Sequence, residues 1–370
     1  MNEKKLLIFI PSVEGGGVEK NFFLITNSLS KVFKEIIVIT ANKNQLKNKI
    51  SNKIKLVGPN SKIGNNKMRY LKYFFSIFYL IKFLVFNKNT LIFSFQANSY
   101  ASLIAKIFRI KIITRSNSSS EGWSKNGLKI FLYKALLKIP NEIIVNSNEF
   151  KKELDKKFNI KTTVIYNPLN KNEIIKKSKI KLNLKFFKKK DLKIISVGRL
   201  VDQKDQITLL KALNLIKEKI KFKLILVGRG GDIEKLKRFV IYNNLSNSVR
   251  FIPFQKNPYN YIVKADLFIL TSKFEGLPNV LLESQCLKKY IISTNCPTGP
   301  KEILLNGNLG DLIPIQNYEK LASKILEFNK NKNKKFIKKK ITNSFIKLSR
   351  FDFDKNMKKY QKIIKEYIYY

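Results

Sequence analysis

Short runs of consecutive apolar residues recur along the chain, and most are separated by longer segments with an apolar residue every three or four positions. Such runs are typical of strands buried on both faces of a parallel sheet, and the longer segments are typical of helices. The alternation predicts an α/β fold with parallel sheets. The predicted strands are residues 5–10, 36–40, 54–57, 91–95, 110–114, 142–146, 163–166, 192–197, 224–227, 249–252, 267–270 and 290–293.

Residues 68–86 form a predicted helix that is rich in aromatic side chains, among them Phe74 and Phe78, and is interrupted by Lys82. Its uninterrupted apolar part is shorter than the ~20 residues that a membrane-spanning helix needs. Two interpretations remain open: a helix buried against a sheet, or an interfacial helix with an aromatic face in lipid. The two are compatible if opposite faces of the helix do the two jobs.

The chain is too long for one compact core, because its 370 residues exceed the size at which single cores stop growing. Two domains are therefore expected, with a boundary after Tyr166-Asn167-Pro168. Residues 170–190 are rich in Lys and Asn and lack a clear core pattern, so they are the predicted linker. Residues 351–370 form a predicted terminal helix.

The charge is strongly basic, with 73 Lys and Arg against 26 Asp and Glu and a formal net charge of +47. This balance favours an anionic partner such as nucleic acid, an acidic membrane surface or an anionic substrate. A compositional bias is the alternative, since Lys, Asn and Ile are abundant throughout. The chain has no His, which excludes a His general base and a His/Cys zinc site, and its two cysteines, Cys286 and Cys296, indicate a reducing compartment.

One loop after a predicted strand carries two carboxylates and the start of a helix. The segment FEGLPNVLLE follows the strand at 267–270, and Gly276 and Pro278 break the chain. Asn279 is expected to cap the helix that starts there, and a helix N-terminus favours anions. Glu275 and Glu283 can accept hydrogen bonds from hydroxyl groups. A ligand with both phosphates and hydroxyls, such as a nucleotide sugar, fits this combination.

Two further loops are expected at the ends of predicted strands. Gly15-Gly16-Gly17 joins the first strand to a helix at 18–29, as phosphate-binding loops do, but Lys20 occupies the place of the third Gly of a dinucleotide motif. A tight turn without a ligand is the alternative. Gly198-Arg199-Leu200 ends the strand at 192–197, and with Lys204 it supplies two cations that can neutralise a leaving diphosphate.

Four segments together resemble the retaining glycosyltransferases of the GT-B fold, family GT4. They are GGGVE, GRLVDQK, FEGLPNVLLE and CPTGPKEIL. The resemblance implies two Rossmann-like domains with parallel sheets facing a central cleft. Residues 1–170, with a C-terminal helix at 353–370, correspond to the acceptor-side domain, and residues 171–352 to the domain that binds the nucleotide sugar.

The resemblance also implies a set of site residues. The catalytic residues are expected to be Arg199, Lys204 and Glu275. Donor-binding residues are expected at Gly16, Gly17, Gly198, Arg199, Lys204, Gly276, Leu277, Pro278, Asn279, Val280 and Glu283. Arg115, Asn117 and Gln96 are candidates for the acceptor, although residues 115–118 can equally form a simple turn. Many family members have a His near the position of Gln96, and this chain has none.

The implied activity is retaining transfer of a hexose or N-acetylhexosamine from a UDP-sugar to a polyprenyl-diphosphate-linked glycan, in bacterial surface polysaccharide synthesis. No cofactor or metal is expected. The enzyme is expected in the cytoplasm, bound peripherally to the anionic inner face of the membrane. A sugar-nucleotide epimerase of the same fold is one alternative, weakened by the absence of His. A basic nucleic-acid-binding protein is another, but the lysines are dispersed rather than concentrated on one element, so no nucleic acid is expected.

Overall fold

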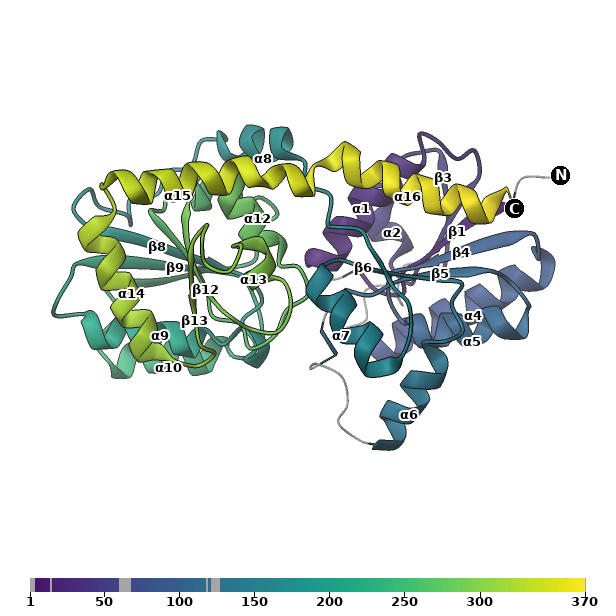
Figure 1. Cartoon of the computed structure of the whole chain (residues 1–370), viewed down its shortest axis with the longest axis horizontal. Helices are drawn as coiled ribbons and strands as arrows, with labels where there is room; N and C mark the ends of the chain where they lie inside the picture. Colours follow the sequence, from purple (N-terminus) through teal and green to yellow (C-terminus); the bar gives the residue numbers. More distant parts are fainter. Residues whose placement is uncertain (1–3, 14, 60–67, 118, 121–126, 370) are drawn as a thin grey trace. The chain divides into compact units, whose positions relative to one another are not determined.

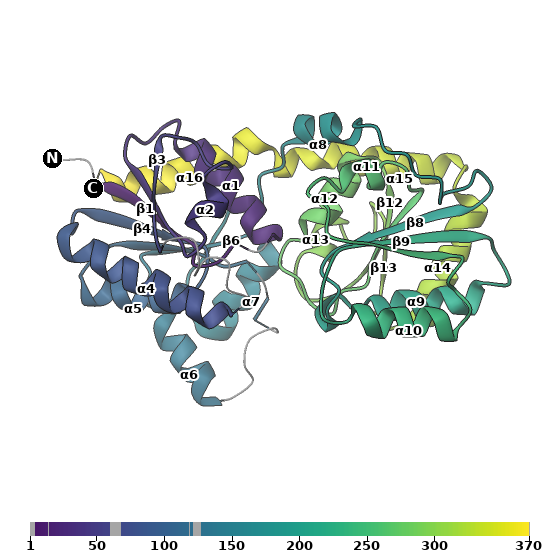
Figure 2. The same cartoon turned by 180° about the vertical axis from the view of Figure 1, so that it is seen from behind.

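The computed structural model describes residues 4–13, 15–59, 68–117, 119–120 and 127–369. The chain divides into two compact units (Figures 1 and 2). Unit 1 comprises Met1–Pro168 and Phe353–Tyr370, and unit 2 comprises Leu169–Asp352. The predicted domain boundaries were residues 170 and 352, and each unit has its own sheet.

Unit 1 contains a seven-stranded parallel sheet in the order β3-β2-β1-β4-β5-β6-β7. Its strands are β1 (Lys5–Phe9), β2 (Ile36–Ile39), β3 (Ile54–Val57), β4 (Thr90–Ser94), β5 (Ile112–Arg115), β6 (Glu142–Val145) and β7 (Thr163–Val164). The strand order reverses between β1 and β4. In open parallel sheets, ligands bind beyond the carboxyl ends of strands at such a reversal.

Helices cover both faces of this sheet because successive residues of each strand point to opposite sides. Leu6 and Ile8 of β1 pack with α1 (Gly17–Leu29) and α16 (Phe353–Ile368). Leu7 and Phe9 pack with α4 (Arg69–Phe86) and α5 (Asn98–Ile107). The other helices described in the unit are α2 (Lys43–Leu46), α6 (Gly127–Leu136) and α7 (Asn148–Phe158).

Unit 2 contains a six-stranded parallel sheet in the order β10-β9-β8-β11-β12-β13, with the reversal between β8 and β11. Its strands are β8 (Leu192–Val197), β9 (Phe222–Val227), β10 (Val249–Ile252), β11 (Leu267–Leu270), β12 (Tyr290–Thr294) and β13 (Asp311–Ile313). Both loops that carry the predicted catalytic residues follow strands at this reversal.

One face of the second sheet packs with α9 (Gln206–Ile216), α10 (Ile233–Tyr242) and α14 (Tyr318–Asn331). A second helical layer contains α8 (Lys171–Ser178), α11 (Tyr259–Ile262), α12 (Asn279–Cys286) and α15 (Lys335–Ile346), in which α8 contacts α11 and α12 contacts α15. The remaining elements are η2 (Asp202–Lys204), α13 (Pro300–Ile303) and η3 (Lys347–Phe351).

The predicted strands are all present, and so is the predicted C-terminal helix, as α16. The prediction of a linker without a core pattern at 170–190 was wrong in its first half, because α8 occupies Lys171–Ser178 and buries Ile174. The strand β13 was missed. No helix among the described residues is both long and apolar enough to cross a bilayer.

Candidate active site

The two loops of unit 2 that follow β8 and β11 lie next to each other, because these strands are neighbours in the sheet. The β8 loop begins at Gly198 and continues into the short helix η2, which ends at Lys204. The β11 loop runs from Thr271 to Pro278 and leads into α12. Parallel strands place their carboxyl ends at one edge, so both loops occupy the edge where ligands bind in such folds.

Lys204 and Glu275 form an ion pair that joins the two loops. The Lys204 Nζ donates to Glu275 Oε1, and their side chains are 14% and 8% exposed. Ser272 Oγ donates to the same Glu275 oxygen at 2.6 Å. The predicted cation and the predicted carboxylate are therefore in direct contact, and the carboxylate is held by a second donor.

Gln203 links Arg199, the other predicted cation, to the β11 loop. Arg199 donates from its guanidinium to Gln203 Oε1 at 2.9 Å, and Gln203 Nε2 donates to the carbonyl of Phe274 at 2.9 Å. The backbone N–H of Lys273 donates to the carbonyl of Gln203 at 2.9 Å. Arg199 itself is exposed, so its charge faces solvent at this edge.

A third loop, between β12 and α13, supports the backbone of Glu275. Thr298 Oγ1 donates to the Glu275 carbonyl at 2.7 Å, and the Glu275 N–H donates to the Pro297 carbonyl at 3.2 Å. Burial, together with the nearby Glu275 charge, raises the pKa of the Cys296 thiol to about 12. Cys296 is consequently a neutral, unreactive part of the loop at physiological pH.

The helix start was predicted one residue too late. α12 begins at Asn279, its N-cap is Pro278, and no side chain caps it. Asn279 therefore occupies the first helical position, and the prediction that it caps the helix was wrong. Glu283 lies in the same helix and is 4% exposed. Gly276, Leu277 and Pro278 form the buried connection between Glu275 and α12.

Four of the candidates in unit 1 follow the strands β1, β4 and β5, which are neighbours in its sheet. Gly16 and Gly17 lie where the β1 loop enters α1. Gln96 follows β4 and accepts from the Ser12 N–H at 3.4 Å. Asn117 follows β5 and donates to the carbonyls of Phe95 and Arg115, at 3.1 Å each. These residues share one edge of the unit 1 sheet.

Arg115 is an exception, because its side chain is fully buried. Its Nε donates to Tyr360 Oη at 2.8 Å, and its Nη2 donates to Asn167 Oδ1 at 2.5 Å. The guanidinium carbon also lies 5.9 Å from the centre of the Phe95 ring. Arg115 is the last residue of β5 and points into the core, so the expectation that it contacts an acceptor at the sheet edge is contradicted.

The sequence did not identify Ser272, Gln203 or Thr298 as parts of the site. Gln203 lies inside the motif GRLVDQK, and Thr298 lies inside CPTGPKEIL. The motifs therefore included both residues but gave no role for either. Ser272 lies three residues before Glu275 in a loop, where a hydroxyl can turn back onto the carboxylate.

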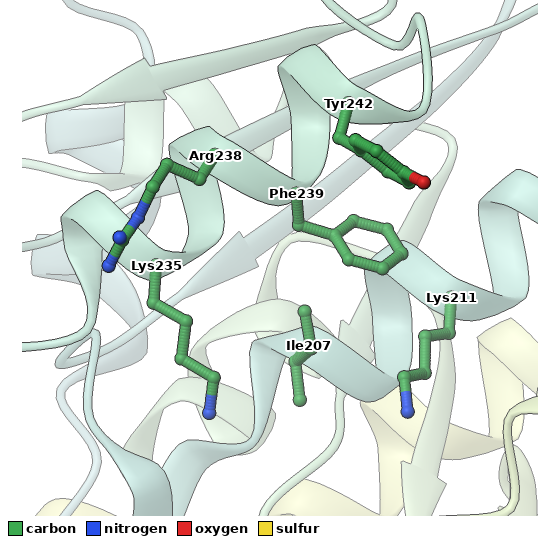
Figure 3. A pocket seen from close by; sticks show the side chains of 6 residues that line it. All are labelled: Ile207, Lys211, Lys235, Arg238, Phe239 and Tyr242. Carbon is green, nitrogen blue, oxygen red and sulfur yellow. The ribbon is translucent and has the colours of Figure 1, made fainter.

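A separate hollow lies between α9 and α10 (Figure 3). It is lined by Ile207 and Lys211 of α9 and by Lys235, Arg238, Phe239 and Tyr242 of α10. None of the predicted site residues lines it. Over the described part of the chain, no group of three or more His, Cys, Asp or Glu side chains is placed to hold a metal ion.

Known proteins resemble this chain in sequence and in fold. Residues 178–347 match the model of the family "Glycosyl transferases group 1". A glycosyltransferase of Methanocaldococcus jannaschii is 32% identical over 59% of this chain, a match that spans only 57% of that relative. The N-acetylgalactosamine-N,N'-diacetylbacillosaminyl-diphospho-undecaprenol 4-alpha-N-acetylgalactosaminyltransferase of Campylobacter jejuni is 27% identical over 85% of this chain and 87% of its own length.

Among solved structures, Anabaena Alr3699/HepE in complex with UDP-glucose superimposes with a TM-score of 0.81. The match covers 98% of this chain and all of that one, at 19% identity. At this identity the likeness concerns the fold, and it extends over both units.

Proposed function

We propose that the chain, whose residues 178–347 match the group 1 glycosyltransferases, is a retaining glycosyltransferase of the GT-B fold that uses a UDP-sugar. The transferred group is a hexose or an N-acetylhexosamine. The acceptor is a polyprenyl-diphosphate-linked glycan, and the product contributes to a bacterial surface polysaccharide. The observation that carries the proposal is the ion pair of Lys204 and Glu275 at the strand-order reversal of unit 2.

The diphosphate of the donor is assigned to Arg199 and Lys204. Departure of the nucleoside diphosphate concentrates negative charge on its terminal phosphate, and two fixed cations stabilise that charge in the transition state. The backbone N–H groups at Asn279 and Val280 begin α12 and add the positive end of the helix dipole. With this charge supplied by the protein, the proposal includes no metal or other cofactor.

Glu275 and Glu283 are assigned to hydroxyl groups, since a carboxylate accepts hydrogen bonds and repels phosphate. Glu283 binds the ribose, and Glu275 binds the transferred sugar beside its anomeric carbon. Glu275 is already held by Lys204 and Ser272, which suits a positioning role better than covalent attack. We therefore assign retention to attack of the acceptor on the face from which the leaving group departs.

The lipid-linked acceptor is supported by the name of the Campylobacter relative, which includes a diphospho-undecaprenol. The assignment of UDP as the nucleotide of the donor is supported by the UDP-glucose complex of the structural neighbour. A lipid-linked acceptor requires the enzyme to work at a membrane surface, and the proposed localisation is peripheral, at the cytoplasmic face.

Transfer of radiolabel from a panel of UDP- and GDP-sugars tests the proposal. The assay contains a polyprenyl-diphosphate-linked glycan fraction prepared from bacterial membranes. One UDP-sugar is expected to label the lipid fraction, and the anomeric configuration of the product, read by NMR, is expected to match that of the donor. If no donor is consumed in the presence of the lipid fraction, the proposal fails, and an inverted product rejects the retaining assignment.

A further inference from the structure

The outward side of α4 is lined by apolar side chains at helical spacing. Leu71, Phe74, Phe78, Ile81 and Val85 recur every three or four residues, and all are exposed. Phe74 is 65% exposed and Phe78 is 53% exposed. The opposite side of the helix buries Leu80 and Leu84 in the core of unit 1. The two interpretations of this helix thus apply to its two sides.

The helices next to α4 continue the same surface. On α5, Tyr100, Leu103 and Ile107 form an exposed stripe, and Ile107 is 68% exposed. On α6, Phe131 and Leu132 are exposed, at 68% and 49%. We call these exposed residues of the three helices the apolar face: Leu71, Phe74, Phe78, Ile81, Val85, Tyr100, Leu103, Ile107, Phe131 and Leu132.

The three helices lie side by side. α4 and α5 cover the same side of the unit 1 sheet, because Leu80 and Leu84 share one core with Ala101 and Ile104. α5 contacts both α4 and α6. Both whole-chain views show the three helices as neighbours (Figures 1 and 2). Many exposed apolar side chains on neighbouring helices are characteristic of an interaction site.

The charge of this surface has one sign. The sequences of α4, α5 and α6 contain no Asp or Glu. Lys82, Lys106 and Lys134 are exposed on the three helices, one on each. Long lysine stems can lie along an apolar layer while their ammonium groups reach phosphate at its surface. The combination of aromatic, aliphatic and cationic side chains matches the interface of an anionic bilayer.

We propose that the apolar face docks unit 1 on an anionic lipid bilayer, with contributions from α5 and α6 as well as α4. A second copy of the chain fits the face less well, since symmetric pairing would bring the uniformly positive surfaces of two copies together. The proposal deepens the proposed function, on which it rests only for the expectation that the acceptor is in a membrane. It adds that docking uses a three-helix surface rather than one helix.

Co-sedimentation with lipid vesicles tests the proposal. Vesicles of phosphatidylcholine alone are compared with vesicles that also contain phosphatidylglycerol, each at low and high salt. The wild-type protein is expected to bind the anionic vesicles, and part of this binding is expected to survive high salt, because insertion of aromatic side chains is not screened.

Two double variants distinguish the contribution of α4 to vesicle binding from that of α5 and α6. Phe74→Ser/Phe78→Ser changes α4, and Ile107→Ser/Phe131→Ser changes α5 and α6. Each double variant is expected to lower the salt-resistant partition coefficient by at least about tenfold. Ile241→Ser/Tyr242→Ser is the matched control, because these residues are 67% and 88% exposed on α10 in unit 2. All six residues are exposed, so the melting temperature is expected to be unchanged.

Absence of binding to either type of vesicle overturns the proposal. Unchanged binding by Ile107→Ser/Phe131→Ser restricts docking to α4 and overturns the three-helix surface. A wild-type dimer in solution that both variants dissociate assigns the face to a second copy. Donor consumption without vesicle binding rejects docking and leaves the proposed function intact. Vesicle binding without transfer of any sugar rejects the proposed function and leaves docking intact.

Discussion

At the scale of single residues, the ion pair of Lys204 and Glu275 sets the state of the unliganded site. Each partner neutralises the other while both are largely buried. A diphosphate that reaches Lys204 must therefore share it with Glu275 or take it from that carboxylate. Ser272 remains as a donor to Glu275 when Lys204 turns to phosphate. The hydrogen bond from Ser272 allows the Glu275 carboxylate to keep its position while Lys204 turns from Glu275 to the phosphate.

Lys204→Ala is expected to reduce kcat more than donor affinity, because the charge that Lys204 meets is larger in the transition state than in the ground state. A stabiliser of this kind contributes roughly 3 kcal/mol, or about a hundredfold in kcat. Steady-state kinetics with the donor that the radiolabel-transfer assay selects provide the measurement. Lys273→Ala is the matched control, since Lys273 lies in the adjacent loop and pairs with the exposed Asp202. A Lys204→Ala enzyme with normal kcat removes Lys204 from the mechanism.

Glu275→Gln and Glu283→Gln are expected to separate sugar from ribose recognition. Loss of a charged hydrogen bond costs about 1.5–3 kcal/mol. Glu283→Gln is expected to weaken UDP and the UDP-sugar equally, because both contain the ribose. Glu275→Gln is expected to weaken only the UDP-sugar. Calorimetric titration of both ligands measures this, and equal losses for both ligands in both variants contradict the assignment.

Residue types in the sequence indicated the chemistry of the site but not every side chain's direction. Lys204 and Glu275 were predicted from separate motifs, and the structure brings them into contact. Arg115 was predicted at a sheet edge, yet its side chain turns inward to Tyr360, a residue far away in sequence. Such a partner is created only by the tertiary fold, so no local pattern could have revealed it.

At the scale of elements, the active-site loops approach one another so closely that glycine is required. Gly299 has φ of +89°, and a Cβ atom there would lie 2.0 Å from the Gly276 carbonyl oxygen. Gly228, which follows β9, has φ of +155°, and a Cβ atom there would lie 1.8 Å from the Gly198 carbonyl oxygen. Each loop that carries a predicted catalytic residue is thus packed against a second loop through a glycine.

Gly299→Ala is expected to destabilise unit 2 by at least ~2 kcal/mol and to weaken donor binding, because the Glu275 loop must move to accommodate the methyl group. Chemical denaturation and titration with UDP measure the two effects. Gly231→Ala is the control, since no atom lies within 4 Å of a Cβ built at that position. Equal stability of the two variants would show that the loop contact tolerates a side chain.

The sequence predicted elements well where they were long or wholly apolar. The wholly apolar strand Leu267–Leu270 and the six-residue strand Leu192–Val197 were predicted to the residue. The strand β13 has three residues, Asp311–Ile313, which is too short for a pattern to emerge. α8 was taken for a linker because its few buried residues, Ile174 and Ser178, are surrounded by lysines. Its helical state depends on contacts with α11 and α12.

At the scale of the whole molecule, unit 1 is completed by the last helix of the chain. Met357, Tyr360, Ile364 and Ile368 of α16 are buried in its core. Tyr360 also accepts the hydrogen bond from the buried Arg115. The parallel pairing of the strands follows from the βα alternation of the sequence, but the return of α16 to unit 1 was expected only from the family resemblance.

Deletion of residues after Asp352 is expected to unfold unit 1 and to leave unit 2 folded. Exposure of four buried side chains costs roughly 6–12 kcal/mol, which equals the whole stability of a typical domain. The thermal transition of unit 1 should disappear while UDP binding to unit 2 persists. Lys358→Ala/Lys359→Ala is the control, because both lysines are exposed on α16. Two intact transitions in the truncated chain would contradict this role for α16.

The position of α16 also affects how the protein is made. Most of unit 1 precedes unit 2 in the chain, yet its core includes a helix that starts at Phe353. At ~5–20 residues per second, synthesis of the part between Pro168 and Phe353 takes roughly 10–40 s. Unit 2 is contiguous and can fold as soon as it leaves the exit tunnel. We therefore expect the nascent N-terminal half to remain incomplete while unit 2 is synthesised, and to be the part that depends most on chaperones during translation.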